Sequence, residues 1–90
     1  MTYVYMVECS DNTLYTGWTV NLDRRLATHN AGRGARYTRS RLPVQLVYWE
    51  RQPDRGSAQR RESALRRISR AAKLRLISEL AQGEMPVPAY

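Results

Sequence analysis

The sequence predicts an α+β fold, a small three-stranded antiparallel sheet flanked by helices, in the order β-β-α-β-α-α. Two strand-like segments joined by turn residues open the chain, a third alternating segment lies near its middle, and capping residues precede the helical segments. The 90 residues suffice for one domain with a modest core. We expect this domain at residues 1–81, followed by a disordered tail at 82–90, where Gly and Pro recur.

The first two strands are expected to form a β-hairpin. Residues 2–8 and 13–19 are rich in Tyr, Val, Thr and Trp, which favour extended structure, and the residues between them include Ser, Asp and Asn. With a three-residue loop, Tyr5 lies opposite Gly17 and shares one sheet face with Tyr15. A four-residue loop would instead place the two tyrosines on opposite faces.

A helix, a basic loop and the third strand come next. Asn21 is a suitable N-cap for a helix that ends near Ala31, because Gly32 follows it. Residues 32–43 carry four arginines and are expected to form a loop. Residues 44–50 then alternate in the manner of a strand.

Two further helices are expected after the third strand. Ser57 is expected to cap a helix that reaches about Ile68, and Ser69 a second helix that reaches about Leu80. Neither an internal repeat nor a shift in composition indicates a second domain.

The chain is strongly basic. Its 15 basic and 8 acidic residues give a net charge of +7, and 14 of the basic residues are arginine. This surplus favours a polyanionic partner, since the planar guanidinium suits bidentate contacts with phosphate. The alternative is a charge that serves solubility alone. The arginines that we expect to contact nucleic acid are Arg24, Arg33, Arg36, Arg39 and Arg41.

Composition also excludes several classes of protein. Cys9 is the only cysteine and His29 the only histidine, which rules out an internal disulfide and a Cys/His zinc cluster. No apolar run approaches the ~20 residues of a membrane span, and no secretion-signal pattern opens the sequence. We therefore expect a cytoplasmic protein without a membrane partner.

Two pairs of residues in and near the hairpin carry side chains that could take part in catalysis. Tyr5 and Tyr15 would present hydroxyls beside Gly17, whose missing side chain would leave an open notch. The alternative is that both rings only pack the sheet. Arg25 and His29 lie four residues apart, so they share one helix face at the edge of its apolar stripe. The alternative there is a solvated basic face with an exposed histidine.

Glu62 is the notable residue of the helix after the third strand. Helical spacing places it between Ala58 and Leu65 on the inward stripe. A carboxylate there needs a partner, since an uncompensated buried charge is costly. Arg66, four residues on, is one candidate partner. A divalent cation is the other, because Mg²⁺ often takes one or two protein carboxylates and keeps several waters.

This spaced set of residues resembles the GIY-YIG nuclease superfamily, and most closely its small single-domain bacterial members of uncharacterised type. The first family motif falls on residues 3–5 and the second on residues 15–17. The family arginine falls on Arg25 and the histidine or tyrosine one turn later on His29. The metal-binding glutamate of the family falls on Glu62.

The resemblance spans about residues 2–78, with departures inside the motifs. Residues 34–38 also match the small members. Tyr3 replaces the glycine of the first motif, and Thr16 is the middle residue of the second. Some repair-type members carry a lysine after the second motif, where this chain has Trp18, so fewer cations surround a catalytic base here.

The resemblance implies hydrolysis of nucleic-acid phosphodiester bonds with one divalent metal ion. It implies that Glu62 holds Mg²⁺ or Mn²⁺ at a single site and that Arg25 binds the scissile phosphate. Tyr5 and Tyr15 would bind and deprotonate the attacking water, with Tyr5 the preferred base. His29 would assist proton transfer or contact phosphate. Because a tyrosine pKa lies near ~10, a base that works at neutral pH needs a pKa ~3 units lower.

Three classes of function stay open. The preferred class is an endonuclease, structure-selective or weakly specific, that acts on DNA in preference to RNA, with DNA repair or recombination as its setting. The second is a nucleic-acid-binding module that has the nuclease fold and little or no catalysis. The third is a domain whose basic surface meets an acidic protein. A monomer or weak dimer is expected in each case.

Overall fold

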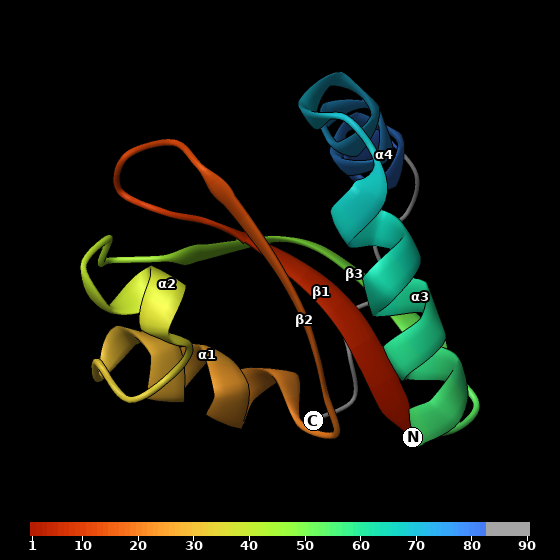
Figure 1. The fold of residues 1–90 in the computed structure, drawn as a ribbon, viewed down its shortest axis with the longest axis horizontal. Coiled ribbons are helices and arrows are strands. Elements are labelled where there is room, and N and C mark those ends of the chain that lie inside the picture. Colours follow the sequence, from red (N-terminus) through yellow and green to blue (C-terminus); the bar gives the residue numbers. More distant parts are fainter. Residues whose placement is uncertain (83–90) are drawn as a thin grey trace.

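The computed structural model describes residues 1–82, which form a three-stranded sheet with helices on both sides (Figure 1). The strands are β1 (Thr2–Glu8), β2 (Leu14–Thr19) and β3 (Gln45–Gln52). The helices are α1 (Leu22–Asn30), α2 (Arg36–Arg39), α3 (Arg55–Arg67) and α4 (Arg70–Gln82). The central strand β1 pairs antiparallel with both β2 and β3, which confirms the predicted fold class.

The hairpin between β1 and β2 has the three-residue loop. The Cys9 N–H donates to the Thr13 carbonyl at 2.8 Å, and Asn12 takes the positive φ of 67° that the tight turn requires. Tyr5 consequently pairs with Gly17 in the register of the two strands. The prediction that depended on this loop length is confirmed.

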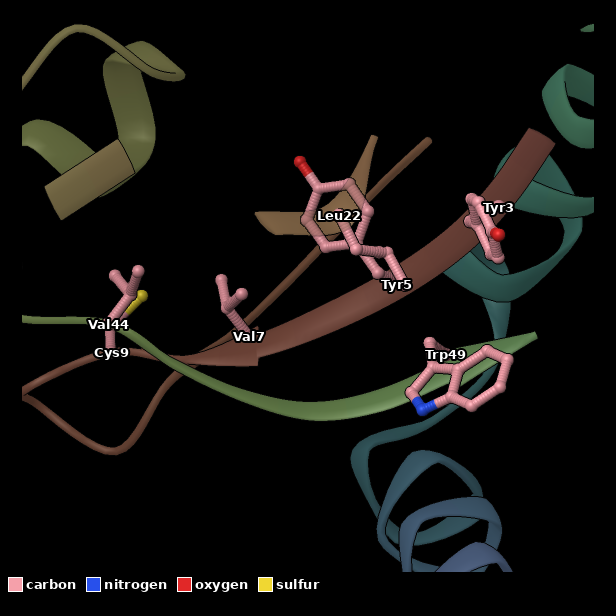
Figure 2. Close-up of a cluster of buried hydrophobic side chains, with 7 residues drawn as sticks. All are labelled: Tyr3, Tyr5, Val7, Cys9, Leu22, Val44 and Trp49. Carbon is pink, nitrogen blue, oxygen red and sulfur yellow. The ribbon is translucent and has the colours of Figure 1, made fainter. Parts of the chain in front are cut away.

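Alternate residues of β1 contribute to two separate cores, one on each face of the sheet. The first core comprises Tyr3, Tyr5, Val7, Cys9, Leu22, Val44 and Trp49 (Figure 2). The second core comprises Val4, Met6, Tyr48, Ala58 and Leu65. Leu22 brings α1 onto the first face, whereas Ala58 and Leu65 bring α3 onto the second. The sheet therefore separates the two helices that carry the candidate site residues.

Helix α1 begins and ends as predicted, but the basic loop after it is not wholly irregular. The Asn21 side chain accepts from the Arg24 N–H at 3.0 Å, and Gly32, with φ +78°, follows the last turn. Residues 36–39 form the additional helix α2. This single turn has no side-chain cap and no apolar periodicity, so the sequence pattern carried no signal for it.

The start of α3 also differs from the prediction. Asp54, not Ser57, is the N-cap, and its carboxylate accepts from the Ser57 N–H at 2.7 Å. Ser69 caps α4 as expected, because its hydroxyl accepts from the Ala72 N–H. Gln82, expected in the tail, is the last residue of α4, and the rest of that tail lies outside the described residues. Within residues 1–82, no helix has the length and apolar character of a membrane span.

Candidate active site

Tyr5 and Tyr15 lie on the sheet face that α1 covers. Tyr5 sits opposite Gly17, and Tyr15 sits opposite Val7 in the neighbouring pair. A Cβ at Gly17 would lie 2.6 Å from the Tyr5 hydroxyl oxygen and 2.8 Å from Cζ. The predicted open notch is therefore wrong. The space beside Gly17 holds the Tyr5 ring itself, and the ring requires the glycine.

The Tyr5 hydroxyl belongs to a buried polar cluster with two residues of α1. Its oxygen lies 2.8 Å from His29 Nε2, and the Arg25 Nε–H donates to it at 3.3 Å. Tyr5 is 2% exposed and His29 is fully buried, so the alternative of an exposed histidine on a solvated face is wrong. The edge of the apolar stripe is where α1 meets the sheet, and that position buries the imidazole.

The other ring nitrogen of His29 is also hydrogen-bonded. His29 Nδ1 lies 2.9 Å from Thr38 Oγ1 of α2, and the Thr38 hydroxyl donates to the Ala35 carbonyl at 2.9 Å. Thr38 is fully buried. No role at the site was predicted for Thr38, because only the arginines of this segment were expected to contact a ligand. A histidine that is buried at the edge of an apolar stripe needs hydrogen-bond partners for both ring nitrogens. That requirement could have indicated a nearby polar residue such as Thr38.

Burial dominates the electrostatics of this cluster. It raises the pKa of Tyr5 above the ordinary value of 10.0, although the Arg25 hydrogen bond and charge oppose the shift. Burial, and then the Arg25 charge, lower the pKa of His29 to about 4. At neutral pH the phenol is protonated and the imidazole neutral. The lowered tyrosine pKa that a preformed phenolate base would need is thus not found at Tyr5.

Tyr15 is the more accessible of the two tyrosines. Its ring meets the His29 ring edge-on at 5.5 Å and stacks on the Tyr37 ring at 6.1 Å. Arg66 Nη2 donates to its hydroxyl at 3.4 Å. A surface pocket of about 400 Å³ opens beside it, lined by Leu14, Tyr15, Thr16, Tyr37, Arg66 and Lys73.

Glu62 and Arg66 approach the cluster from the other side of the sheet. Both lie on α3, and Arg66 Nη2 is 3.6 Å from Glu62 Oε2, so the ion pair weighed as an alternative is present. The Arg66 guanidinium also donates to the backbone carbonyl of Thr16 on the outer strand β2 at 3.0 Å. Arg66 thus links the predicted metal carboxylate to the strand that carries Tyr15.

The carboxylate of Glu62 could hold a hydrated cation. Its side chain is 20% exposed, and the charge of Glu62 contributes to raising the pKa of Tyr5 across the sheet edge. No group of three or more His, Cys, Asp or Glu side chains suited to a metal exists within residues 1–82. This donor set fits Mg²⁺ bound through one carboxylate with water as the remaining ligands.

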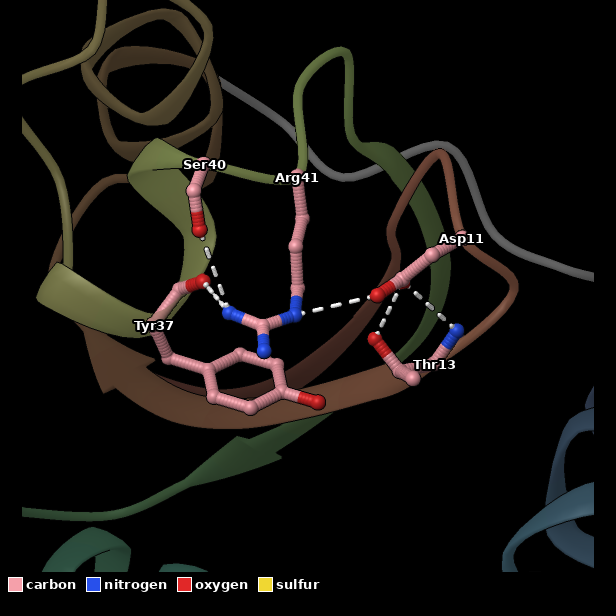
Figure 3. Close-up of polar contacts among 5 residues, drawn as sticks. All are labelled: Asp11, Thr13, Tyr37, Ser40 and Arg41. Carbon is pink, nitrogen blue, oxygen red and sulfur yellow. Dashed lines mark hydrogen bonds and ion pairs between the residues drawn. The ribbon is translucent and has the colours of Figure 1, made fainter.

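The predicted nucleic-acid-binding arginines fall into two groups. Four of them lie exposed on α1 and the following segment, namely Arg24, Arg33, Arg36 and Arg39. Arg41 is partly buried and makes several contacts within the chain (Figure 3). Its Nε pairs with Asp11 at 3.0 Å, its Nη1 donates to the Tyr37 carbonyl, and its guanidinium lies 3.9 Å from the centre of the Tyr37 ring. Arg41 therefore ties α2 to the hairpin turn.

The chain is similar in sequence to known proteins. The GIY-YIG catalytic domain matches residues 1–75. A UPF0213 protein of Staphylococcus haemolyticus is 53% identical over 77 residues, which cover 86% of this chain and 94% of that protein. A UPF0213 protein of Lactiplantibacillus plantarum is 56% identical over 78 residues, covering 84% and 77% of the two chains.

A solved structure has the same fold. The solution NMR structure of a UPF0213 protein from Bacillus halodurans is 40% identical, with a TM-score of 0.59, and the match covers 94% of this chain and 92% of that one. The GIY-YIG domain implies a nuclease family and nucleic acid as the class of substrate. The match over residues 1–75, together with these relatives, shows that the chain belongs to the GIY-YIG family.

Proposed function

We propose that the protein is a divalent-metal-dependent endonuclease that hydrolyses nucleic-acid phosphodiester bonds. The observation that carries this proposal is the cluster of buried Tyr5 and His29 with half-buried Arg25, next to the accessible Tyr15. Burying an arginine stem, an imidazole and a phenol together is costly for a fold that needs only packing. A site that moves a proton beside a phosphate explains the choice of groups.

Arg25 and Glu62 are the proposed charge-balancing residues. Arg25, half-buried against Tyr5, would stabilise the charge that develops on the scissile phosphate. The Glu62 carboxylate would hold Mg²⁺ or Mn²⁺, which when bound neutralises charge on phosphoryl oxygens and the leaving group. Arg66 would have to release Glu62 for this, and its exposed guanidinium would then be free to contact phosphate.

The proton of the attacking water would pass to Tyr5 as the Tyr5 proton passes to His29 Nε2. A stepwise transfer from Tyr5 to His29 in the resting site is unfavourable, because burial raises the pKa of the phenol and lowers the pKa of the imidazole. A relay in which Tyr5 gains one proton while it loses another avoids a free phenolate. Tyr15 would orient the water from the accessible side.

The test is cleavage of a substrate panel with and without Mg²⁺ or Mn²⁺. The panel comprises branched, nicked and single-stranded DNA and the corresponding RNA, because we propose structure-selective or weakly specific cleavage, with DNA preferred, in repair or recombination. Glu62→Gln and Arg25→Ala should each lower kcat/KM by about 100-fold or more. Glu79→Gln and Arg75→Ala remove the same charges from exposed positions of α4 and should change it less than twofold. Full activity in both site variants refutes the assignment.

A nucleic-acid-binding module without catalysis is the second candidate. The raised pKa of Tyr5 and the exposed arginines of residues 33–39 favour it. Such a module binds without metal, tolerates Glu62→Gln, and loses affinity with salt at a log–log slope of about −0.9 per neutralised duplex phosphate. Binding measured with EDTA present, beside the cleavage panel, separates the two candidates.

A further inference from the structure

The segment that leads into α2 is built around the His29 ring. Thr38 is fully buried, and its hydroxyl lies within hydrogen-bond distance of both His29 Nδ1 and the Ala35 carbonyl. A Cβ at Gly34 would overlap His29 Nδ1 and approach His29 Cγ to 2.8 Å, so the backbone at Gly34 lies directly against the Nδ1 side of the imidazole. These contacts leave the ring one orientation.

We propose that Thr38 is a positioning residue that fixes the tautomer of His29, so that Nε2 is free to accept the Tyr5 proton. This inference rests on the proposed function only in its last step, the use of the fixed tautomer in the cleavage reaction. The claim about the tautomer concerns the folded chain without metal or nucleic acid, and it can be tested alone.

The tautomer of His29 follows from the number of protons that its hydrogen-bond partners carry. The Thr38 hydroxyl has one proton, which it donates to the Ala35 carbonyl at 2.9 Å. Its oxygen can therefore only accept from His29, so Nδ1 carries the imidazole proton. A neutral imidazole with a protonated Nδ1 has a bare Nε2, and the Tyr5 hydroxyl donates to it at 2.8 Å.

The opposite tautomer satisfies fewer groups. With the proton on Nε2, both His29 and the Arg25 Nε–H would donate to the single phenol oxygen of Tyr5. The Tyr5 proton would then have no acceptor among the contacts of the described residues, and a buried donor left without a partner is destabilising. The observed set, in contrast, gives each proton one acceptor.

The consequence for the reaction is a directed proton path. As the water oxygen bonds to phosphorus, a water O–H bond breaks and a Tyr5 O–H bond forms, while the former Tyr5 proton forms the Nε2–H bond of His29. The imidazolium is then stabilised by the Thr38 oxygen through Nδ1–H. After cleavage it returns its proton to Tyr5, which passes one to solvent, and the leaving oxygen takes one from solvent.

The experiment uses the full chain labelled with ¹⁵N-histidine. Because the sequence has one histidine, long-range ¹H–¹⁵N NMR spectra show a single pair of ring nitrogens. At neutral pH we expect Nδ1 at the position of a protonated nitrogen and Nε2 at that of an unprotonated one. The reverse pattern, or an averaged pair, in the wild-type chain overturns the proposal.

Two variants at position 38 sharpen the result. Thr38→Ser keeps the hydroxyl and should keep both the nitrogen pattern and kcat within about threefold. Thr38→Val keeps the shape, and the Ala35 carbonyl retains backbone N–H donors from residues 38 and 39. It should shift the pattern toward Nε2–H and lower kcat about tenfold with KM little changed.

The outcomes separate the two proposals. A Thr38→Val chain with the wild-type nitrogen pattern and kcat refutes the positioning role. If that variant does not fold, the spectra of the wild type and Thr38→Ser still decide. The expected pattern in a chain that cleaves none of the panel supports the tautomer assignment and defeats the proposed function.

Discussion

On the α1 side of the sheet Tyr5 and His29 of the candidate site are buried and closely hydrogen-bonded, whereas on the α3 side Glu62 and Arg66 are partly exposed and loosely paired. Tyr5 and His29 are 2.8 Å apart with almost no exposed surface. Glu62 and Arg66 are 3.6 Å apart, and the Arg66 side chain is 51% exposed. Folding thus fixes the groups that would move protons, together with Arg25, while it leaves Glu62 and Arg66 free to change partners.

The largest expected effect tests whether the buried cluster around Tyr5 takes part in catalysis. Tyr5→Phe removes the hydroxyl that His29 and Arg25 both contact, and we expect cleavage to fall about 1,000-fold, within the range for loss of a general base. Tyr48→Phe removes a buried phenol hydroxyl from the opposite face and should leave single-turnover rates unchanged. Equal rates for the two variants would show that the cluster only packs.

The second effect concerns stability against pH. The folded pKa of His29, about 4, lies below the ordinary value of 6.5, so the unfolded chain takes up a proton first as the pH falls. Above pH ~7 this proton uptake does not occur and the stability is unaffected. Between pH ~6.5 and ~4 it should lower the free energy of unfolding progressively, by up to about 3 kcal/mol. Urea unfolding across this range measures it. His29→Gln should flatten the wild-type slope, and a parallel slope would mean that other groups cause it.

The third effect tests the close contact at Gly17. Gly17→Ala forces the Tyr5 ring away, because the new Cβ would lie 2.6 Å from its hydroxyl oxygen. We expect a loss of about 2 kcal/mol in the free energy of unfolding, as for other overpacked cores, together with loss of cleavage. Gly56→Ala on α3 is the control, since its nearest contact is the flexible end of Arg60 at 3.3 Å. Comparable losses in the two variants would contradict this account.

The smallest effect concerns the loosely paired side. Arg66→Gln removes the cation that occupies Glu62, so binding of Mn²⁺ to the free protein should tighten about threefold, in keeping with a partly exposed pair worth less than about 1 kcal/mol. Electron paramagnetic resonance of Mn²⁺ without nucleic acid measures this directly. Weaker Mn²⁺ binding in the variant would mean that Arg66 supports the metal site and does not compete with it.

The sequence predicts the backbone of this protein better than the surroundings of its polar groups. Strand composition and turn residues were enough for the hairpin but left its loop length open, and the caps Asn21 and Ser69 were correctly identified. Asp54 was missed because Ser57, three residues later, is an equally good cap by type. Helix caps and turns depend on residues close together in the sequence, so errors in predicting them shift an element by only a few residues.

The candidate site depends on contacts between distant segments. The pairing of Tyr5 with His29 was within reach of spacing arguments, since both lie at the edge between α1 and the sheet. The role of Thr38 was not, because a single-turn helix has no periodic signal and the arginines around it dominate its composition. The open notch predicted beside Gly17 was wrong because a sequence does not show which side chain fills the space next to a glycine.

The contact between Arg66 of α3 and strand β2 also affects association between molecules. β2 is an outer strand, and outer strands present unpaired carbonyls that can recruit the strand of another molecule. The Arg66 guanidinium donates through Nε and Nη2 to the Thr16 carbonyl, and so places a charge across the middle of that open edge. The same side chain that pairs with Glu62 thereby disfavours edge-to-edge pairing of another strand at β2.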